Sequence, residues 1–270
     1  MIRNSGRNGA RFAPASLLAT FKRLTQTSSF KDQLLLEIEV ASVEEEERNF
    51  HQAQEQESQR IRSILREHPA ARIVHIGGGH DHIYPLLLAY AGTYKEILVI
   101  NIDAHADTRT DESFHSGTPF RQFADGFKGR FELFQVGLNR FANSSTTLEP
   151  LTRGEHRILW RKEMSAARLD AFFEEMKKSV MTETLVVFSL DADAIDAAHV
   201  PGVSAVNPEG LSMAEVQDLW KRYLELGFKH PPVMGVYELN PVYDTLAGLS
   251  MRTIAGVVFE GLRGSERELC

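Results

Sequence analysis

The segment NIDAHADTR, residues 101–109, carries three side chains that can bind a metal ion. Asp103, His105 and Asp107 alternate with other residues and follow an apolar run, 97–102, which predicts a buried parallel strand. Residues two apart in an extended chain point the same way, so Asp103 and His105 can converge on one point. Two carboxylates and an imidazole, without cysteine, suit a divalent ion such as Mn²⁺. Taken alone, the pattern is equally compatible with a solvated polar loop.

Further candidate ligands lie just past the expected ends of other strands. Apolar strand patterns alternate with helical patterns, which is typical of a parallel sheet with helices on its faces. His80, Asp191, Asp193 and Glu238 each come shortly after such a strand. Because open parallel sheets bind ligands at the carboxyl ends of their strands, these separate motifs predict one shared site. The strands are expected at 33–40, 72–76, 97–102, 131–138, 157–160, 185–190 and 232–237.

The length of 270 residues fits one α/β domain, residues 1–270, since no change in composition divides the chain. Ser212 is the expected cap of one of its helices. The stretch around 116–119, rich in Gly, Thr and Pro, is expected to be a loop. Helices are expected at 14–24, 43–67, 166–180, 211–226 and 245–260, with a further one that ends at Tyr90.

The charges of the candidate ligands also favour a metal site. Asp103, Asp107, Asp191 and Asp193 supply four negative charges, which two divalent cations would neutralise. Without metal these carboxylates would repel one another, and some would have to protonate. Two ions about 3.5–4 Å apart can share such ligands and lower the pKa of a water between them. The predicted chemistry is therefore metal-assisted hydrolysis.

Other interpretations of single motifs are weaker. The glycines at 77–79 could form a phosphate loop, but they lack the spacing of a dinucleotide fingerprint and the Lys-Ser/Thr of a P-loop. Asp191 and Asp193 alone could cap a helix. No Gly-x-Ser-x-Gly elbow is present, so a serine hydrolase is not expected. Four histidines have no supporting neighbours in the sequence and are expected to be structural or surface residues: His75, His82, His156 and His230.

The composition predicts an ordinary globular protein and argues against nucleic acid and membrane partners. The hydrophobic fraction of 43% and the charged fraction of 25% are ordinary for such a protein. A net charge of −7 argues against nucleic acid as a partner, and no apolar run is long enough to span a membrane. The single cysteine, Cys270, cannot form an internal disulfide and is a poor candidate nucleophile. This cysteine usage fits a cytoplasmic location.

Together the motifs resemble those of the ureohydrolase family, which includes arginase, agmatinase and formimidoylglutamase. The resemblance implies a three-layer α/β/α domain with a mainly parallel sheet, two Mn²⁺ ions and a homo-oligomer, either trimer or hexamer. It rests on five stretches: GGGHD (77–81), NIDAHAD (101–107), SLDADAID (189–196), PGVSAVNPEGL (201–211) and ELNP (238–241).

The resemblance also implies roles for individual residues. Glu238 would accept the N–H groups of a cationic guanidinium or formimino group, a charge-assisted pairing. Asp193 would hold the attacking hydroxide in place. The first ion would be held by His80, Asp103, Asp107 and Asp191, and the second by Asp103, His105, Asp191 and Asp193.

The sequence GGGH, Arg109 after the metal motif and the loop at 116–122 look most like formimidoylglutamase. Arginases and agmatinases usually have a proton-carrying histidine directly before the glycine of that loop. Here Ser116 takes that place, and His115, one residue earlier, is the candidate proton carrier. Arg109 or Arg121 could bind a substrate carboxylate with two hydrogen bonds, or could form a structural ion pair.

The amino-terminal stretch from Asn4 to Pro14 resembles the family's substrate loop, which makes Asn4 a candidate substrate contact. The family's first strand, which precedes that loop, is expected to be missing. The leading prediction is hydrolysis of N-formimidoyl-L-glutamate to L-glutamate and formamide. The alternatives are an agmatinase-type guanidino hydrolase that releases urea, and a subunit that binds metal but is catalytically silent.

Overall fold

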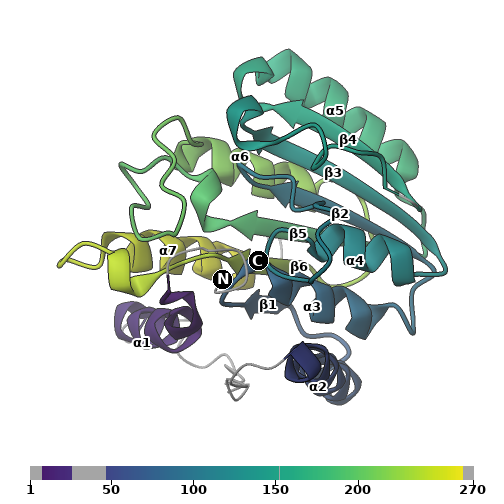
Figure 1. The fold of residues 1–270 in the computed structure, drawn as a ribbon, viewed down its shortest axis with the longest axis horizontal. Helices are drawn as coiled ribbons and strands as arrows, with labels where there is room; N and C mark the ends of the chain where they lie inside the picture. Colours follow the sequence, from purple (N-terminus) through teal and green to yellow (C-terminus); the bar gives the residue numbers. More distant parts are fainter. Residues whose placement is uncertain (1–7, 26–46, 152, 264–270) are drawn as a thin grey trace, which may run out of the picture.

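The protein is built around a six-stranded parallel sheet with the strand order β1-β6-β5-β2-β3-β4 (Figure 1). The computed structural model describes residues 8–25, 47–151 and 153–263. Asn4, Cys270 and the expected strand at 33–40 lie outside the described residues. The strands are β1 (Ile73–Ile76), β2 (Glu96–Ile102), β3 (Arg130–Leu138), β4 (Glu155–Trp160), β5 (Thr184–Asp191) and β6 (Val233–Tyr237).

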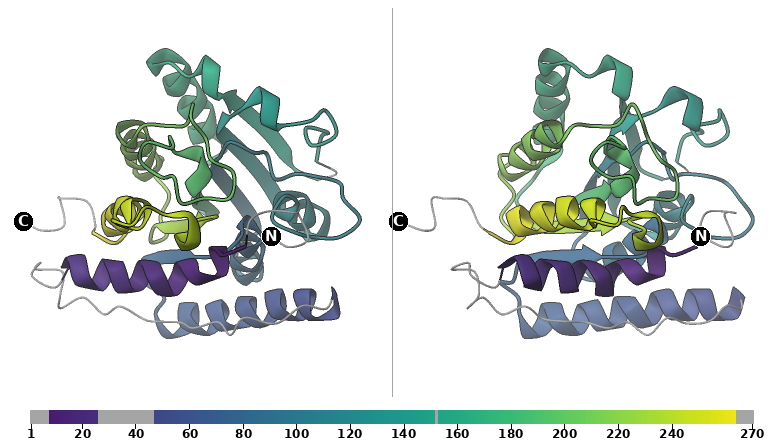
Figure 2. Two further views of the ribbon diagram at one scale, coloured as in Figure 1. Left: turned by 60° about the vertical axis from the view of Figure 1, so that its left-hand side comes forward. Right: turned by 90° about the vertical axis from the view of Figure 1, so that its left-hand side faces the viewer.

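Helices cover both faces of this sheet and give the three-layer α/β/α architecture that was expected (Figure 1, Figure 2). On one face lie α1 (Ala13–Thr25), α5 (Ala166–Ser179), α6 (Met213–Leu224) and α7 (Leu249–Leu262). On the other face lie α2 (Glu47–Glu67), α3 (Ile83–Tyr90) and α4 (Pro119–Gly126). The longest described helix, α2, is polar, and no helix in the described ranges is both long and apolar enough to cross a membrane.

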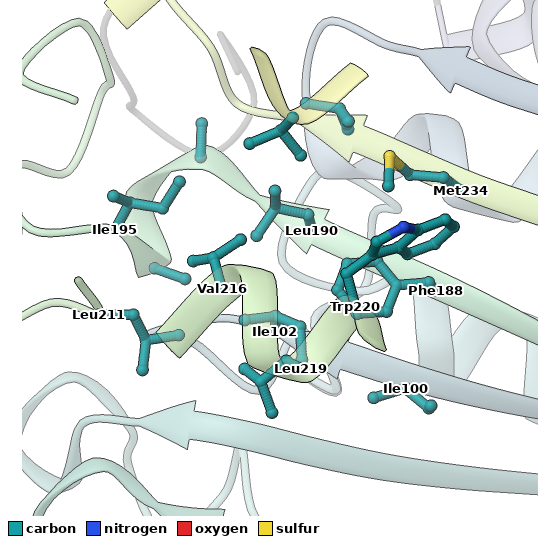
Figure 3. Close-up of a cluster of buried hydrophobic side chains, with 14 of the residues drawn as sticks. Ile100, Ile102, Phe188, Leu190, Ile195, Leu211, Val216, Leu219, Trp220 and Met234 are labelled. Carbon is teal, nitrogen blue, oxygen red and sulfur yellow. The ribbon is translucent and has the colours of Figure 1, made fainter. Parts of the chain in front are cut away.

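The central strands are apolar on both faces because each face is covered by helices. Along β2, Leu98 and Ile100 pack into one core cluster, whereas Ile97 and Val99 pack into the other. Alternate residues of a strand point to opposite faces, so one apolar run supplies both cores. Figure 3 shows the first cluster, in which the ring of Trp220 on α6 meets that of Phe188 on β5 edge-on, with ring centroids 5.2 Å apart.

The expected elements within the described residues are present, with boundaries that differ by a few residues. The helix expected from Thr245 begins only at Leu249, because the carboxylate of Asp244 accepts the backbone N–H groups of Ser250 and Met251. Helix α4 was not expected. It is only 8 residues long, and it starts with Pro119, which the sequence pattern assigned to a loop. A proline suits the first turn of a helix because its missing N–H would have no helical partner there.

Strand β1 forms one edge of the described sheet and pairs only with β6 on its other side. All four of its residues are half-buried rather than exposed. This is the edge beside which α2 lies (Figure 1, Figure 2). The expected loss of the family's first strand concerns residues outside the described ranges and stays a prediction.

The cap of α6 gives a test of how local sequence stabilises the fold. Ser212 accepts the backbone N–H of Glu215, and the Glu215 side chain accepts the backbone N–H of Ser212, which completes a capping box. We expect Ser212→Ala to lower the free energy of unfolding by about 1 kcal/mol in urea denaturation. Ser212→Thr keeps the hydroxyl and serves as the control. Equal stability of the alanine variant and the wild type would show that the cap contributes nothing.

Candidate metal centre

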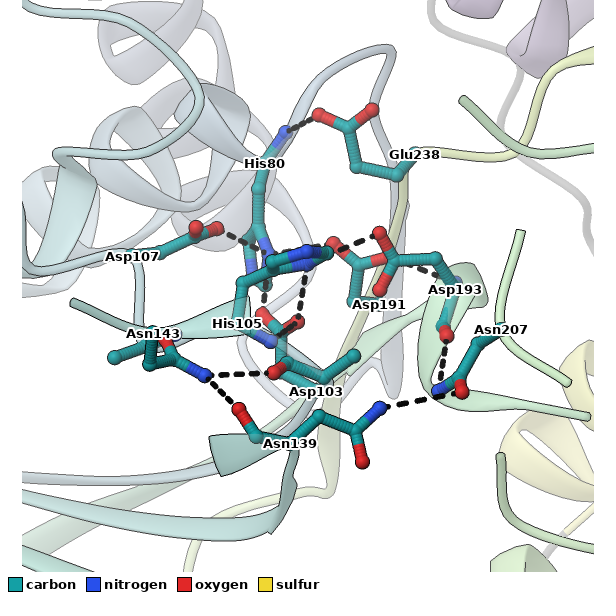
Figure 4. Close-up of polar contacts among 12 residues, drawn as sticks. His80, Asp103, His105, Asp107, Asn139, Asn143, Asp191, Asp193, Asn207 and Glu238 are labelled. Carbon is teal, nitrogen blue, oxygen red and sulfur yellow. Dashed lines mark hydrogen bonds and ion pairs between the residues drawn. The ribbon is translucent and has the colours of Figure 1, made fainter. Parts of the chain in front are cut away.

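The predicted ligands converge at the carboxyl ends of neighbouring strands (Figure 4). Asp103 follows β2, Asp191 ends β5, Glu238 follows β6, and His80 lies in the short 3-10 helix after β1. Because β1, β6, β5 and β2 are adjacent in the sheet, their ends place these side chains together. His80, Asp103 and Asp191 are almost fully buried. The position at the strand ends is the one that the sequence predicted.

One group of donor atoms surrounds His80. Its Nδ1 lies 3.1 Å from Asp103 Oδ2, 3.0 Å from Asp107 Oδ2 and 3.0 Å from Asp191 Oδ2. Two donor atoms bound at right angles to one ion, each at about 2.1 Å, are about 3.0 Å apart, so these spacings suit a shared cation. On the other side of the ring, Ser189 Oγ lies 2.9 Å from Nε2. A proton on Nε2 that bonds to Ser189 leaves the lone pair of Nδ1 facing the carboxylates.

A second group lies beside the first and shares Asp103 with it. His105 Nδ1 is 3.2 Å from Asp193 Oδ2 and 3.6 Å from Asp103 Oδ1. Asp103 therefore offers one oxygen to each group. The Oδ1 atom of Asp193 is buried and has no hydrogen-bond partner in the described part of the chain, as expected for an atom that awaits a ligand.

Asp191 belongs to the first group, and its Oδ1 accepts the backbone N–H of Asp193 at 2.8 Å. Its role as a second bridging ligand stays a prediction. The donor set, with two imidazoles and four carboxylates, contains no thiolate and fits hard to borderline divalent cations. The residues present thus fit the two ions that the resemblance implied.

The protonation of this cluster shows the repulsion that the sequence predicted for a metal-free site. Burial and the charge of Asp103 raise the pKa of Asp107 to about 6. Burial and the charges of Asp193 and Asp103 raise the pKa of Asp191 well above its usual value. Burial by itself lowers the pKa of His80, but its three carboxylate partners outweigh that effect and raise it well above 6.5. Bound protons thus supply part of the positive charge that cations would otherwise supply to the cluster.

Backbone conformation also marks this site. Asp107 has a φ of 51° and Glu238 a φ of 59°, and in the described ranges they are the two residues other than glycine with positive φ. Such conformations cost on the order of 1–3 kcal/mol and persist where the surrounding structure requires them. Here the backbone N–H of Glu238 bonds to Gly78 O at 2.8 Å, which ties the loop after β6 to the loop after β1.

Three asparagines that sequence reasoning missed hold the ligand loops in place (Figure 4). Asn143 accepts the N–H of Ala106 and donates to the carbonyl of Ala104, so it fixes both sides of His105. Asn207 donates to the carbonyl of Asp193 and accepts from Asn139. Asn207 stands in the stretch PGVSAVNPEGL, but Asn139 and Asn143 had no motif that could have singled them out.

The carboxylate of Glu238 is buried beside the loop that carries His80. Its Oε1 accepts the backbone N–H of His80 at 3.0 Å. A Cβ atom added to Gly79 would lie 3.2 Å from Glu238 Oε1 and 3.3 Å from Ser116 Cβ, so Glu238 and Ser116 flank this glycine. Burial and the charge of Asp193 raise the pKa of Glu238 to about 7. A bound cation would therefore favour the charged carboxylate.

The candidate proton carrier His115 is held by two hydrogen bonds. The backbone N–H of Gly117 donates to Nδ1 at 3.0 Å, and Nε2 lies 2.7 Å from Asp111 Oδ2. An Nδ1 that accepts is unprotonated, so the ring carries its proton on Nε2 and donates to Asp111. Burial lowers the pKa of His115. A path for protons would run through Asp111, whose side chain is 39% exposed.

The two arginines proposed for a substrate carboxylate have different surroundings. Arg121 is buried and donates to the backbone carbonyls of Thr108, Pro150 and Glu149. These bonds occupy its guanidinium, which supports the structural alternative for Arg121. Arg109 is partly exposed, pairs with Asp111 at 2.7 Å, and lines a cavity of about 270 Å³ together with Asp111 and with serine and threonine residues. Arg109 is therefore the candidate that can reach a ligand.

Two of the remaining histidines have the structural contacts that were expected. His156 Nε2 lies 3.0 Å from Gln135 Oε1, and His230 Nε2 accepts the backbone N–H of Val186 at 2.9 Å. Neither histidine contacts the metal ligands.

Comparisons with known proteins agree with this fold and site. A family model described as the arginase family matches residues 1–263. The chain is 30% identical over 271 residues to the formimidoylglutamase of Geobacillus kaustophilus (strain HTA426), a match that covers 98% of the chain and 80% of that relative.

Solved structures show the same architecture. That of formimidoylglutamase from Bacillus subtilis subsp. subtilis str. 168 has a TM-score of 0.79 and 24% identity, and the match covers 93% of the chain and 80% of that structure. That of Trypanosoma cruzi formiminoglutamase with Mn²⁺ has a TM-score of 0.72 and 22% identity, with 97% of the chain and 87% of that structure covered.

The parallel sheet between two helix layers, with a buried His/Asp cluster at its strand ends, defines an arginase-like α/β protein. The chain belongs to the arginase family, whose members are hydrolytic enzymes. The resemblance seen in the motifs and the expected fold are both confirmed.

The shared position of Asp103 leads to a first test of the site. Titrated with Mn²⁺, Asp193→Ala should lose the second ion and keep the first, whereas Asp103→Ala should weaken both because it removes an oxygen from each group. Bound metal per chain after dialysis measures this. Asp125→Ala, which removes an exposed aspartate on α4, is the control. Loss of only one ion from Asp103→Ala would contradict the shared ligand.

The protonated state of the cluster leads to a second test. Below their raised pKa values His80, Asp107 and Asp191 hold protons, and a cation must displace these to bind. We therefore expect the apparent affinity for Mn²⁺ to rise with pH, through the raised pKa of Asp107 at about 6 and above it, with net release of protons. Calorimetric titration in two buffers of different ionisation enthalpy measures both quantities. A pH-independent affinity would argue against these protonation states.

Proposed function

We propose that this protein is a formimidoylglutamase that depends on two Mn²⁺ ions and converts N-formimidoyl-L-glutamate and water into L-glutamate and formamide. The observation that carries the proposal is the convergence of all six predicted ligands in two groups that share Asp103, beside the buried carboxylate of Glu238. Family membership and the relatives named formimidoylglutamase support the substrate. The Trypanosoma cruzi formiminoglutamase with Mn²⁺ supports the metal.

The ions would supply positive charge that lowers the pKa of a water and polarises the formimino group. His80, Asp103, Asp107 and Asp191 would hold the first ion, and Asp103, His105, Asp191 and Asp193 the second. The free Oδ1 of Asp193 would orient the attacking water. The reaction joins this water to the formimino carbon, breaks the bond from that carbon to the glutamate nitrogen, and transfers a proton to that nitrogen.

Substrate recognition would use opposite charges at the two ends of the molecule. The formimino group is cationic and planar, and Glu238 would accept its N–H groups. The glutamate part carries carboxylates, and Arg109, with the hydroxyls that line its cavity, would bind one of them. Ser116 would contact the substrate near Glu238. Delivery of a proton by His115 through Asp111 also belongs to this proposal, as does Asn4 as a substrate contact.

Arg109 also separates the two candidate substrates. Agmatine has no carboxylate, so an agmatinase-type reaction that releases urea would give Arg109 no role in binding the substrate. A catalytically silent subunit that binds metal would account for the six ligands but not for the buried carboxylate of Glu238 beside them. The cytoplasmic location and assembly into trimers or hexamers complete the proposal and rest on cysteine usage and on the resemblance alone.

A substrate screen tests the reaction directly. The Mn²⁺-loaded protein should release formamide from N-formimidoyl-L-glutamate and should release little urea from agmatine, arginine or guanidinobutyrate. The same screen on Asp193→Ala is the control for contaminating activity. Urea from agmatine without formamide from formimidoylglutamate would replace the proposed substrate with the guanidino alternative. No turnover with both ions bound would favour the silent subunit.

Arg109→Met tests the contact with the substrate carboxylate. Loss of a charged hydrogen bond that is made equally in the bound substrate and the transition state should raise KM about ten- to hundredfold and leave kcat nearly unchanged. Steady-state kinetics measure both constants. Arg168→Met, at an exposed position on α5, is the matched control. An unchanged KM for Arg109→Met would exclude this arginine from substrate binding.

A further inference from the structure

Tyr237, the last residue of β6, lies flat against the ring of the metal-ligand candidate His80. Their ring centroids are 4.8 Å apart and their planes differ by 23°. Tyr237 is fully buried. Two glycines make room for it, because an added Cβ would lie 2.7 Å from its ring at Gly77 and 2.3 Å from its hydroxyl at Gly235. The tyrosine therefore occupies a slot that the backbone of β6 and of the loop after β1 leaves open.

The hydroxyl of Tyr237 begins a chain of hydrogen bonds that leads away from the metal centre. It lies 3.0 Å from His75 Nδ1, and His75 Nε2 lies 2.9 Å from Glu57 Oε1. Glu57 also meets His82 Nδ1 at 2.9 Å. A carboxylate only accepts, so both imidazoles donate to Glu57. With that proton on Nε2, the Nδ1 atom of His75 can accept the hydroxyl hydrogen of Tyr237.

This chain joins elements that are distant in the sequence. Glu57 comes from α2, His75 from the edge strand β1, and Tyr237 from β6. His75 and His82, which have no supporting neighbours in the sequence, thus meet a shared partner in the fold. Glu57 is only 5% exposed. Burial by itself raises the pKa of this carboxyl, but the charge of His82 and the hydrogen bonds of both histidines outweigh it and lower the pKa to about 2.

The ring of His80 is enclosed on several sides. Tyr237 stacks on one face, Phe120 meets it edge-on with centroids 5.5 Å apart, and Ser189 bonds its Nε2. Only Nδ1 faces the carboxylates. A change in the tilt of Tyr237 must therefore tilt the imidazole or open a gap beside it, because buried rings in contact move together.

We propose that Tyr237, His75 and Glu57 are positioning residues that hold His80 in the orientation its Nδ1 needs to bind the first ion. The proposal rests on the metal centre of the proposed function and adds to it a part of helix α2. Docking of α2 through Glu57 fixes His75, His75 fixes the hydroxyl of Tyr237, and the tyrosine ring fixes His80. Metal affinity thereby depends on a carboxylate that contacts no metal ligand.

Substitutions that keep shape but break the chain test this proposal. Tyr237→Phe keeps the stacked ring and removes the hydroxyl. Glu57→Gln keeps the volume of the side chain, but its amide brings an N–H donor to a place where two imidazole N–H groups already donate. We expect each to weaken Mn²⁺ binding at the first ion's site about tenfold, the lower end of the range for residues that orient a ligand. The double variant should be no weaker than the more affected single one, because both act through one chain. Calorimetric titration with Mn²⁺ measures these affinities.

Two matched controls separate positioning from general loss of stability. Tyr223→Phe removes the hydroxyl of another fully buried tyrosine, which bonds to the backbone of Val186 and Val233 near the opposite end of the strands. Glu132→Gln changes another buried, ion-paired glutamate. Both should lower the Tm of the metal-free protein without changing Mn²⁺ affinity. Unchanged affinity in Tyr237→Phe and Glu57→Gln, with Tm losses like those of the controls, would overturn the proposal.

The measurement of Mn²⁺ affinity distinguishes a failure of this proposal from a failure of the proposed substrate. If the wild type binds two Mn²⁺ ions and the variants bind more weakly, the positioning chain stands even when formimidoylglutamate is not hydrolysed. If the wild type binds no Mn²⁺, the metal centre and the positioning chain both fail. Additive losses in the double variant would show that Glu57 and Tyr237 act separately, which also overturns the chain.

Discussion

The structure depends on one electrostatic constraint: several carboxylates must stay close together in a site that water barely reaches. Asp103, Asp107 and Asp191 all lie within about 3 Å of one imidazole nitrogen. Like charges at that distance and depth are unfavourable unless cations or protons balance them. The raised pKa values of Asp107 and Asp191 express this imbalance in the protein alone.

Rigid elements hold this arrangement against its own repulsion. Asp103 follows β2 and Asp191 ends β5, and both strands are buried on both faces in two apolar clusters. Asn143 and Asn207 fasten the loops beyond the strand ends, and the positive φ of Asp107 and Glu238 is kept by the same surroundings. A close-packed core resists the small shifts of the strand ends that would relieve this repulsion. The carboxylates therefore stay close enough together to share a cation.

The two ends of the site differ in how firmly they are held. The metal end is built on strand ends, whereas Arg109, Asp111 and His115 lie in a loop between β2 and α4. Loops that are supported by a rigid scaffold usually carry the part of a site that varies with substrate. Arg121 links this loop to the segment before β4, because it donates to the carbonyl of Thr108 and to those of Glu149 and Pro150.

The sequence by itself determined the parallel α/β fold and the position of the metal ligands. Continuous apolar runs mark the strands, and a candidate ligand directly after a strand must lie at its carboxyl end. Helix α4 escaped prediction because it is short and its first residue, Pro119, belongs to a stretch rich in Gly, Thr and Pro that is typical of a loop. Only the tertiary structure decided that Arg121 bonds to three backbone carbonyls, that Asn139 joins two loops, and that Glu57 reaches Tyr237 through His75. These contacts join residues far apart in the chain, and no local pattern records which distant side chains the packing of helices and strands will bring together.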